Sequence, residues 1–177
     1  MRSLTSYIAL LRAVNVGGTG KLPMAELKAM CVTLGFTHVQ TYIASGNVVF
    51  QSALSEAKVK AALETKLAAY AGKPVGVHIR SAAQMQAVHD DNPFAQAAPN
   101  RVMAIFVDTP VDKTMLTGVT GQKDEQIALG SDDTQVLYVN YGEGMAQSKL
   151  KIPAAKTGTA RNMNTVAKLV DMVFAIN

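Results

Sequence analysis

The ten residues Thr41–Phe50, TYIASGNVVF, constrain the fold of this chain more than any other stretch. Apolar and β-branched residues stand on both sides of Ser45-Gly46-Asn47, and glycine supplies the positive φ that a tight turn between two strands needs. The stretch therefore predicts a β-hairpin whose tip carries three small polar groups. A helical pattern lies on each side of it along the chain, so the hairpin is expected to supply two strands of a mixed α+β fold.

The pattern of apolar residues before and after the hairpin predicts the order βαββαβ for residues 1–80. Pro23 suits the first turn of a helix, Gly35 its end, and Ser55 the cap of a second helix. The expected strands cover residues 6–13, 39–44, 47–51 and 74–80, and the expected helices cover 24–34 and 55–71. This order is that of the ferredoxin-like arrangement.

The rest of the chain repeats part of this order. A bridging helix is expected over residues 81–91, and NPFAQAAPN, residues 92–100, marks a boundary. The strands expected after it cover residues 102–108, 126–129 and 135–141, and the helices cover 112–119, 147–150 and 162–175. The predicted fold is therefore α+β, with ferredoxin-like halves at 1–80 and 101–177, the 81–100 segment between them, and the last strand of the second half missing.

The composition bounds the class of protein. The chain has 177 residues, of which 49% are hydrophobic and none is Trp, so an aliphatic core is expected. Its net charge of +4 permits an anionic partner without requiring one. The single cysteine, Cys31, excludes an internal disulfide and fits a reducing compartment. No apolar run reaches the ~20 residues of a membrane span, and the first residues do not resemble a secretion signal. A cytoplasmic protein without a membrane partner is expected.

Polar groups are expected to converge at one edge of the first sheet. In a βαββ sheet the first two strands run parallel with the third between them, so the end of strand one, the start of helix one and the hairpin tip share an edge. The residues expected there are Arg12, Asn15, Gly17, Gly18, Lys21, Ser45, Gly46 and Asn47. Glycine amides, a helix N-terminus and two cations favour an anion. The alternative, weighed equally, is a tight loop whose Asn side chains cap the backbone.

A second polar stretch follows in the late part of the chain. Ser148 and Lys149 open it, and Arg161, Asn162 and Asn164 close it. A phosphate or carboxylate would use the Arg161 guanidinium as a two-pronged donor and the amides for orientation. The alternative is an ordinary helix cap at Asn162 beside exposed lysines.

Other chemistry is not indicated by the sequence. The three histidines, His38, His78 and His89, do not have the spacing of metal ligands, so no metal site is expected. Cys31 lies on an apolar helix stripe and is expected in the core. No residue pattern identifies a catalytic group or a cofactor, and whether the protein is an enzyme stays open.

Five blocks in this order resemble the bacterial domain-of-unknown-function 1697 family, over nearly the whole chain. The blocks are YIALLRAVNVGG, TYIASGNVVF, Asn92-Pro93-Phe94, Ser148-Lys149-Leu150 and TARNMNT from Thr159. The resemblance implies two ferredoxin-like halves and brings no established activity. The family's polar positions carry over to Arg12, Asn15, Ser45, Gly46, Asn47, Ser148, Lys149, Arg161, Asn162, Asn164 and Thr165. Ala13 stands where the family usually has Gly, and Met163 where it usually has Trp, a ring that could stack on a ligand.

These features favour a protein that binds an anionic small molecule, such as a phosphate-bearing metabolite or a nucleotide, in a cleft between the halves. The first alternative is a nucleic-acid-binding module, which a pI of about 9.2 allows. An enzyme without a readable motif is the second. The third is an interaction or scaffold protein whose polar cluster is purely structural.

Overall fold

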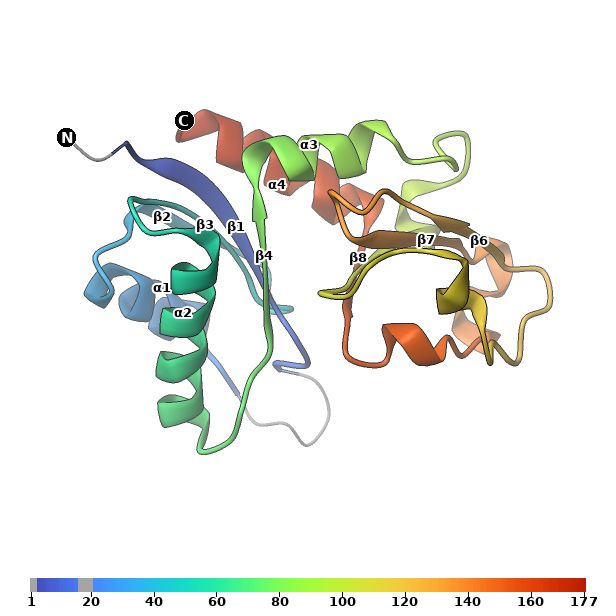
Figure 1. Ribbon diagram of the computed structural model, residues 1–177, viewed down its shortest axis with the longest axis horizontal. Helices are drawn as coiled ribbons and strands as arrows, with labels where there is room; N and C mark the ends of the chain where they lie inside the picture. Colours follow the sequence, from blue (N-terminus) through green and yellow to red (C-terminus); the bar gives the residue numbers. More distant parts are fainter. Residues whose placement is uncertain (1–2, 16–20) are drawn as a thin grey trace. The chain divides into compact units, whose positions relative to one another are not determined.

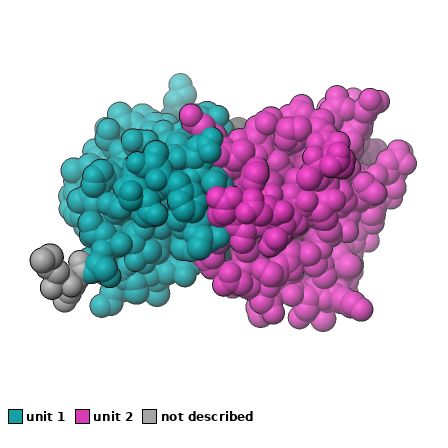
Figure 2. Space-filling view, turned by 90° about the horizontal axis from the view of Figure 1, so that it is seen from above, with its two compact units in different colours: residues 1–83, 169–177 teal, residues 84–168 magenta. Residues whose placement is uncertain are grey.

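The computed structural model describes residues 3–15 and 21–177. The chain divides into two compact units, Met1–Ala83 with Leu169–Asn177, and Gln84–Lys168 (Figure 2). Each unit contains one four-stranded antiparallel sheet. The protein is therefore a mixed α+β protein with two sheets.

The sheet of the first unit has the strand order β2-β3-β1-β4 (Figure 1). Its strands are β1 (Thr5–Leu11), β2 (Thr37–Tyr42), β3 (Asn47–Ser52) and β4 (Val77–Ser81), with helices α1 (Met24–Thr33) and α2 (Glu56–Ala71). Because β3 pairs antiparallel with both β1 and β2, these two run parallel on either side of it. The hairpin and the βαββαβ order expected from the sequence are both confirmed, with strand and helix bounds that shift by a few residues.

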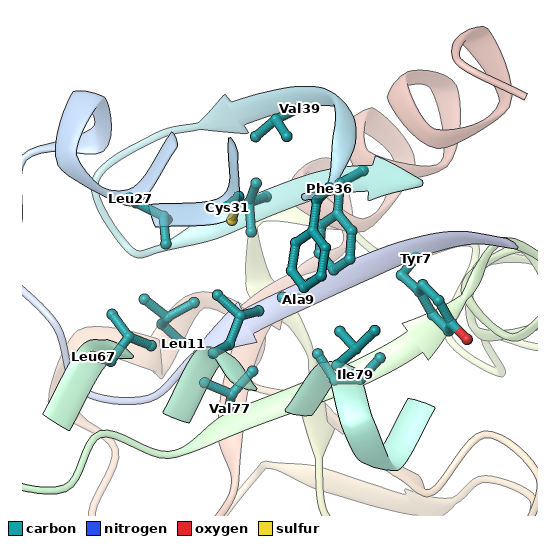
Figure 3. Packing of buried hydrophobic residues seen from close by; sticks show 14 of the residues in the cluster. Tyr7, Ala9, Leu11, Leu27, Cys31, Phe36, Val39, Leu67, Val77 and Ile79 are labelled. Atoms are coloured by element: carbon teal, nitrogen blue, oxygen red, sulfur yellow. The ribbon is translucent and has the colours of Figure 1, made fainter. Parts of the chain in front are cut away.

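Successive side chains of a strand point to opposite faces of the sheet, so every second side chain faces the two helices and packs against them (Figure 3). Leu11 and Ile79 of the sheet pack with Cys31 of α1 and Leu67 of α2. The rings of Phe36 and Phe50 stack with centroids 4.4 Å apart and planes 7° apart. Burying each such side chain stabilises the fold by about 1.5–3 kcal/mol. Cys31 is fully buried, as expected, and burial raises the pKa of its thiol to about 12.

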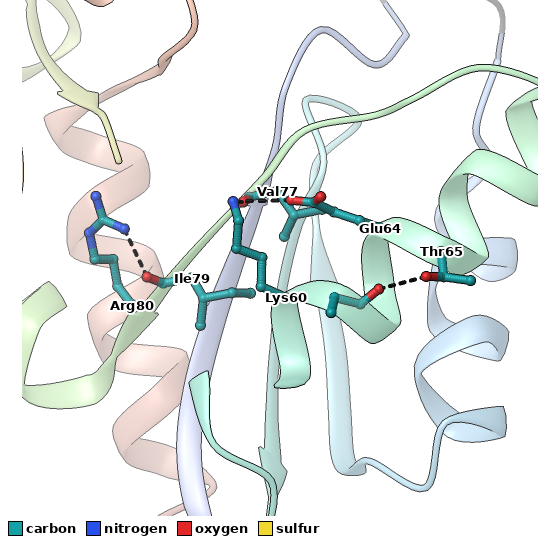
Figure 4. A network of polar contacts seen from close by, with 7 residues as sticks. Lys60, Glu64, Thr65, Val77, Ile79 and Arg80 are labelled. Carbon is teal, nitrogen blue, oxygen red and sulfur yellow. Dashed lines mark hydrogen bonds and ion pairs between the residues drawn. The ribbon is translucent and has the colours of Figure 1, made fainter. Parts of the chain in front are cut away.

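Local signals in the sequence fix the ends of α2. Ser55 accepts a hydrogen bond from the Lys58 backbone N–H, and Gly72, at φ +72°, ends the helix in the left-handed conformation. In α2, Lys60 donates to the Val77 carbonyl oxygen at 2.5 Å and lies 3.0 Å from Glu64 (Figure 4). This contact fastens the helix to the start of β4.

The second face of the first sheet carries polar side chains between apolar ones. Arg80, only 1% exposed, points away from α2 and donates from Nη1 to the Ile79 carbonyl oxygen at 2.8 Å (Figure 4). On the same face, Ser6 accepts from Gln51 at 3.3 Å and donates to Asn177 at 2.9 Å. The last residues of the chain are thereby tied to β1.

The sheet of the second unit has the order β6-β7-β5-β8. Its strands are β5 (Val102–Phe106), β6 (Gln126–Leu129), β7 (Val136–Asn140) and β8 (Thr159–Asn162). The prediction that this half lacks its last strand is wrong, because β8 pairs with β5 from Phe106↔Thr159 to Met103↔Asn162. This strand is short and polar, with Arg161 inside it, so no run of apolar residues reveals it. Pairing with β5 makes it a strand.

Short 3₁₀ turns replace some of the helices expected in the second half. Lys113–Leu116 forms one such turn after Asp112, whose side chain accepts from the Thr114 N–H at 2.8 Å. The helix expected over 147–150 is wrong in place, because the 3₁₀ turns lie at Gly142–Gln147 and Pro153–Ala155. Glycine and proline in these segments favour tight turns over an α-helix.

Two longer helices follow the edge strands directly. They are α3 (Ala82–Asp90), after β4, and α4 (Met163–Ala175), after β8. Within the second unit, the Tyr138 hydroxyl of β7 donates to the Val88 carbonyl oxygen of α3 at 2.7 Å. Burial, with a smaller contribution from Asp91, raises the pKa of Tyr138. Among the residues that the structure describes, no helix is both long and apolar enough to cross a membrane.

We expect Gly46→Ala to lower the free energy of unfolding by about 2–4 kcal/mol. Gly46 has φ +91°, and a Cβ atom there would lie 2.7 Å from Val14 Cγ2 and 2.9 Å from Leu11 Cβ. Urea unfolding measures the loss. Gly72→Ala is the matched control, since its φ is +72° and its Cβ would meet nothing within 4 Å; about 1 kcal/mol is expected. Equal losses in the two variants would contradict the close approach.

Candidate functional site

A pocket of about 410 Å³ lies in the first unit, beyond the end of β1. Its walls come from residues 12–14, from Lys21 and Leu22 before α1, and from the last turn of α2 with the connection to β4. These segments meet because β4 is antiparallel to β1, which places the start of β4 beside the end of β1. The pocket lies at the edge where the sequence predicted a site.

Positive charge dominates the rim of this pocket. Arg12, Lys21 and Lys73 line it, and all three side chains are exposed. None of the described residues that line it is Asp or Glu. The floor is apolar, since Val14, Leu22 and Leu67 are 8%, 6% and 1% exposed. Such a pocket suits a ligand with an anionic group and an apolar part.

Backbone hydrogen bonds fix the position of Arg12. The Leu11 N–H donates to the Gly46 carbonyl oxygen at 2.8 Å, and the Arg12 N–H donates to the Gly76 carbonyl oxygen at 2.9 Å. The end of β1 is thus held between the hairpin tip and the connection to β4. The expected proximity of hairpin tip and strand end is confirmed.

Asn15 follows the pocket residues 12–14 and hydrogen-bonds to two other segments of the first unit. Its Nδ2 donates to the carbonyl oxygens of Leu22, at 2.9 Å, and Ala44, at 2.8 Å, and its Oδ1 accepts from the Leu22 N–H at 2.6 Å. The side chain therefore joins Asn15 to Leu22, before α1, and to Ala44 of the hairpin. Gly17 and Gly18, predicted in the same site, lie outside the described residues.

Asn47 stabilises the hairpin from inside. It is 0% exposed, and its Nδ2 donates to the Tyr42 carbonyl oxygen at 2.9 Å and to Ser45 Oγ at 3.0 Å. Asn15 and Asn47 thus both cap backbone carbonyls, which is the alternative that the sequence left open. That these amides orient a ligand stays a prediction.

The late polar residues lie in the second unit and have a different setting. Ser148 and Lys149 line a pocket of about 150 Å³ together with Asp124 and Glu125. The Ser148 hydroxyl donates to the Glu125 carboxylate, which also accepts from the Lys123 N–H at 2.7 Å. These bonds, the one from Ser148 first, hold the pKa of Glu125 below its usual value. Lys123 and Lys149 line this pocket beside Asp124 and Glu125, so its formal charges balance, in contrast to the pocket of the first unit.

Arg161 and Asn162 have structural contacts within the second unit. Arg161 is 5% exposed and donates from Nη1 to Thr159 Oγ1 at 2.7 Å and to the Ala160 carbonyl oxygen at 2.9 Å. Burial lowers the pKa of its guanidinium to about 10, which leaves it charged at neutral pH. Asn162 accepts from the Thr165 N–H at 2.9 Å and so caps α4.

The sequence-predicted residues thus fall into two sets, one in each unit. Arg12, Asn15, Lys21, Ser45, Gly46 and Asn47 belong to the first unit, and Ser148, Lys149, Arg161, Asn162, Asn164 and Thr165 to the second. That both sets face one cleft stays a prediction. Lys73 and Tyr70, which also line the first pocket, were not predicted from the sequence. The antiparallel pairing of β4 with β1 was the signal that could have found Lys73.

The structure describes both positions, Ala13 and Met163, at which the sequence departs from the family it resembles. Ala13 has φ +56°, a left-handed conformation that glycine adopts without strain. Met163 is only 4% exposed, so this position offers no open surface on which a ligand ring could stack. Within the described parts of the chain, no group of three or more His, Cys, Asp or Glu side chains is placed to hold a metal ion.

Fold and pocket together define a small α+β protein with two four-stranded antiparallel sheets and a basic pocket in its first unit. The model of the family described as "Protein of unknown function (DUF1697)" matches residues 4–135, and the chain belongs to this family.

The chain is similar over almost its whole length to a solved structure. This structure is that of the conserved bacterial protein SP0830 from Streptococcus pneumoniae, with 26% sequence identity and a TM-score of 0.77. The similarity covers 97% of this chain and 99% of that one. No curated protein matches the chain.

Ala13→Gly is expected to stabilise the protein. Relief of the strained φ of +56° contributes about 1–2 kcal/mol, and the greater freedom of glycine in the unfolded chain offsets about half of it. A net gain of about 0.5–1 kcal/mol should appear as a higher midpoint of urea unfolding. The control is Ala25→Gly, at an exposed position inside α1, which should lose about as much. A loss in both variants would show that Ala13 is not strained.

Ser148→Ala should destabilise the protein in a pH-dependent way. Because the pKa of Glu125 is lowered in the folded state, its contribution is complete above the ordinary carboxyl pKa and is lost as the pH falls through the lowered value. The difference in unfolding free energy between wild type and variant should therefore be largest near about pH 7 and shrink toward about pH 3. Ser148→Thr, which keeps a hydroxyl, is the control. A difference that does not change with pH would contradict the assignment.

Proposed function

We propose that the first unit binds a small anionic molecule, such as a phosphate-bearing metabolite or a nucleotide, in the pocket of about 410 Å³. One observation carries the proposal. Arg12, Lys21 and Lys73 surround a partly apolar pocket whose described lining contains no carboxylate. A guanidinium forms paired hydrogen bonds to phosphate or carboxylate oxygens, and lysines add charge without directional demands.

The partial charge at the C-terminal end of α2 indicates how the ligand is oriented in the pocket. The last turn of α2 carries carbonyl groups whose partial negative charge repels anions, and Lys73 follows directly after that turn. The anionic group is therefore expected near Arg12 and Lys21, on the side of the pocket formed by the end of β1. The rest of the ligand extends toward Leu67 and Tyr70 of α2.

We further propose that the two units are two copies of one ferredoxin-like arrangement. Their sheets have corresponding strand orders, in which β8 takes the place of β4. Each of these strands carries a buried arginine, Arg80 or Arg161, that donates to the carbonyl oxygen of the preceding residue. In both cases a helix begins two residues later. A cytoplasmic location, suggested by the single buried cysteine, belongs to the same proposal.

A second candidate is an interaction or scaffold protein in which the polar residues are structural. It is favoured by the protein contacts of Asn15, Asn47 and Asn162, each of which caps backbone groups. The two candidates differ in the role of the pocket cations, because a scaffold does not need them for a ligand.

The proposed function is tested with pyrophosphate and adenosine monophosphate as probes, at low salt. Binding should raise the melting temperature of the full chain in proportion to the logarithm of probe concentration. We expect Lys21→Gln to weaken binding about fivefold, and Arg12→Gln at least as much, because each removes a charge-assisted contact. Calorimetric titration measures the change.

The matched control is Lys28→Gln, on the exposed surface of α1 and outside the pocket lining, which removes the same charge from the same unit. It should leave affinity within about twofold of wild type. Neither probe binding at all, or an equal loss in Lys28→Gln and Lys21→Gln, would reject the pocket and favour the scaffold.

A further inference from the structure

The pocket in the first unit is larger than a phosphate group requires. Its volume of about 410 Å³ lies in the range of pockets that enclose a whole organic metabolite. The cations lie at the rim, whereas buried Leu22 and Leu67 form the apolar floor. An inorganic anion held at Arg12 and Lys21 would leave the apolar part in contact with water.

An aromatic ring lies on the apolar side of this pocket. Tyr70 is in the last turn of α2 and lies three residues after Leu67, so the two side chains share one side of the helix. Leu67 reaches the core of the first unit (Figure 3), and its exposed fraction is 1%. Tyr70 lines the pocket and is 47% exposed. Its ring is available to a ligand.

A proline residue lines the same pocket as Tyr70. Pro74, in the connection to β4, also lines the pocket and is exposed. An aromatic ring and a proline ring present rigid apolar surfaces that lose little conformational entropy on binding. Planar groups make larger contact with such surfaces than branched or hydrated sugar chains do. A cation near the rim adds attraction to a ring face.

We infer that this pocket takes an aromatic phosphate ester, whose ring packs against Tyr70 and whose phosphate lies at Arg12 and Lys21. The inference rests on the proposed function and narrows it from anions in general to ring-bearing ones. Polyol phosphates of similar charge bind more weakly, because they leave the Tyr70 surface unfilled.

The test compares three probes of the same charge class with the full chain: phenyl phosphate, glycerol phosphate and inorganic phosphate. Titrations followed by ³¹P NMR use one nucleus for all three, at about pH 8, where the phosphates are dianions. Phenyl phosphate is expected to bind at least about fivefold more tightly than glycerol phosphate, the size of an aromatic contact. Lys21→Gln should weaken all three.

Variants at Tyr70 distinguish the contribution of the ring contact to affinity from the contribution of charge. Tyr70→Leu keeps an apolar side chain and should abolish the preference for phenyl phosphate while leaving glycerol phosphate affinity within about twofold. Tyr70→Phe keeps the ring and should retain the preference. Because Tyr70 is half-exposed, both variants are expected to fold, and their melting temperatures check this.

The outcomes distinguish failure of the anion site from failure of the preference for an aromatic ligand. Equal binding of phenyl and glycerol phosphate, with loss of both in Lys21→Gln, overturns the aromatic ligand and leaves the anion site standing. A preference that survives in Tyr70→Leu overturns the contact with Tyr70. Absence of binding for all three probes overturns the anion site and the aromatic ligand together.

Discussion

The approach of the hairpin tip to the end of β1 is the constraint on which the first unit depends. The Leu11 N–H bonds to the Gly46 carbonyl oxygen at 2.8 Å, and the missing side chain of Gly46 permits it. This contact sets where β1 ends and therefore where Arg12 begins. Asn15 then donates to the Ala44 carbonyl oxygen of the same hairpin. The fold and the pocket thus share one junction, so a change that opens the hairpin moves the cations as well.

Several residues that the sequence assigned to a site are buried polar groups with hydrogen bonds inside their own unit. An amide or guanidinium removed from water costs free energy unless its hydrogen bonds are replaced. Asn47 Nδ2 and Arg161 Nη1 donate to carbonyl and hydroxyl oxygens of their own unit. Exposed cations carry no such requirement. This difference separates Arg12 and Lys21, which line the pocket, from the polar residues that maintain the backbone.

Much of the first unit could be predicted from the sequence, because its signals are local. Apolar periodicity, Ser55 as a cap and Gly46 in the turn each act within a few residues. The second unit was predicted less well. Strand β8 forms by pairing with β5, and the residues Thr159–Asn162 have no apolar pattern that predicts a strand. For the pocket, Arg12 and Lys21 followed from the shared edge, whereas no local signal in the sequence assigns the exposed Tyr70 of α2 to a site.

The burial of Cys31 has a practical consequence. Its thiol is 0% exposed, and its pKa of about 12 keeps it protonated at neutral pH, so it reacts slowly with electrophiles. The chain contains one cysteine, so a second thiol introduced on the surface would be the one that a maleimide dye labels first. The protein therefore accepts site-specific fluorophores or spin labels without prior removal of its native sulfhydryl, which suits distance measurements between its two units.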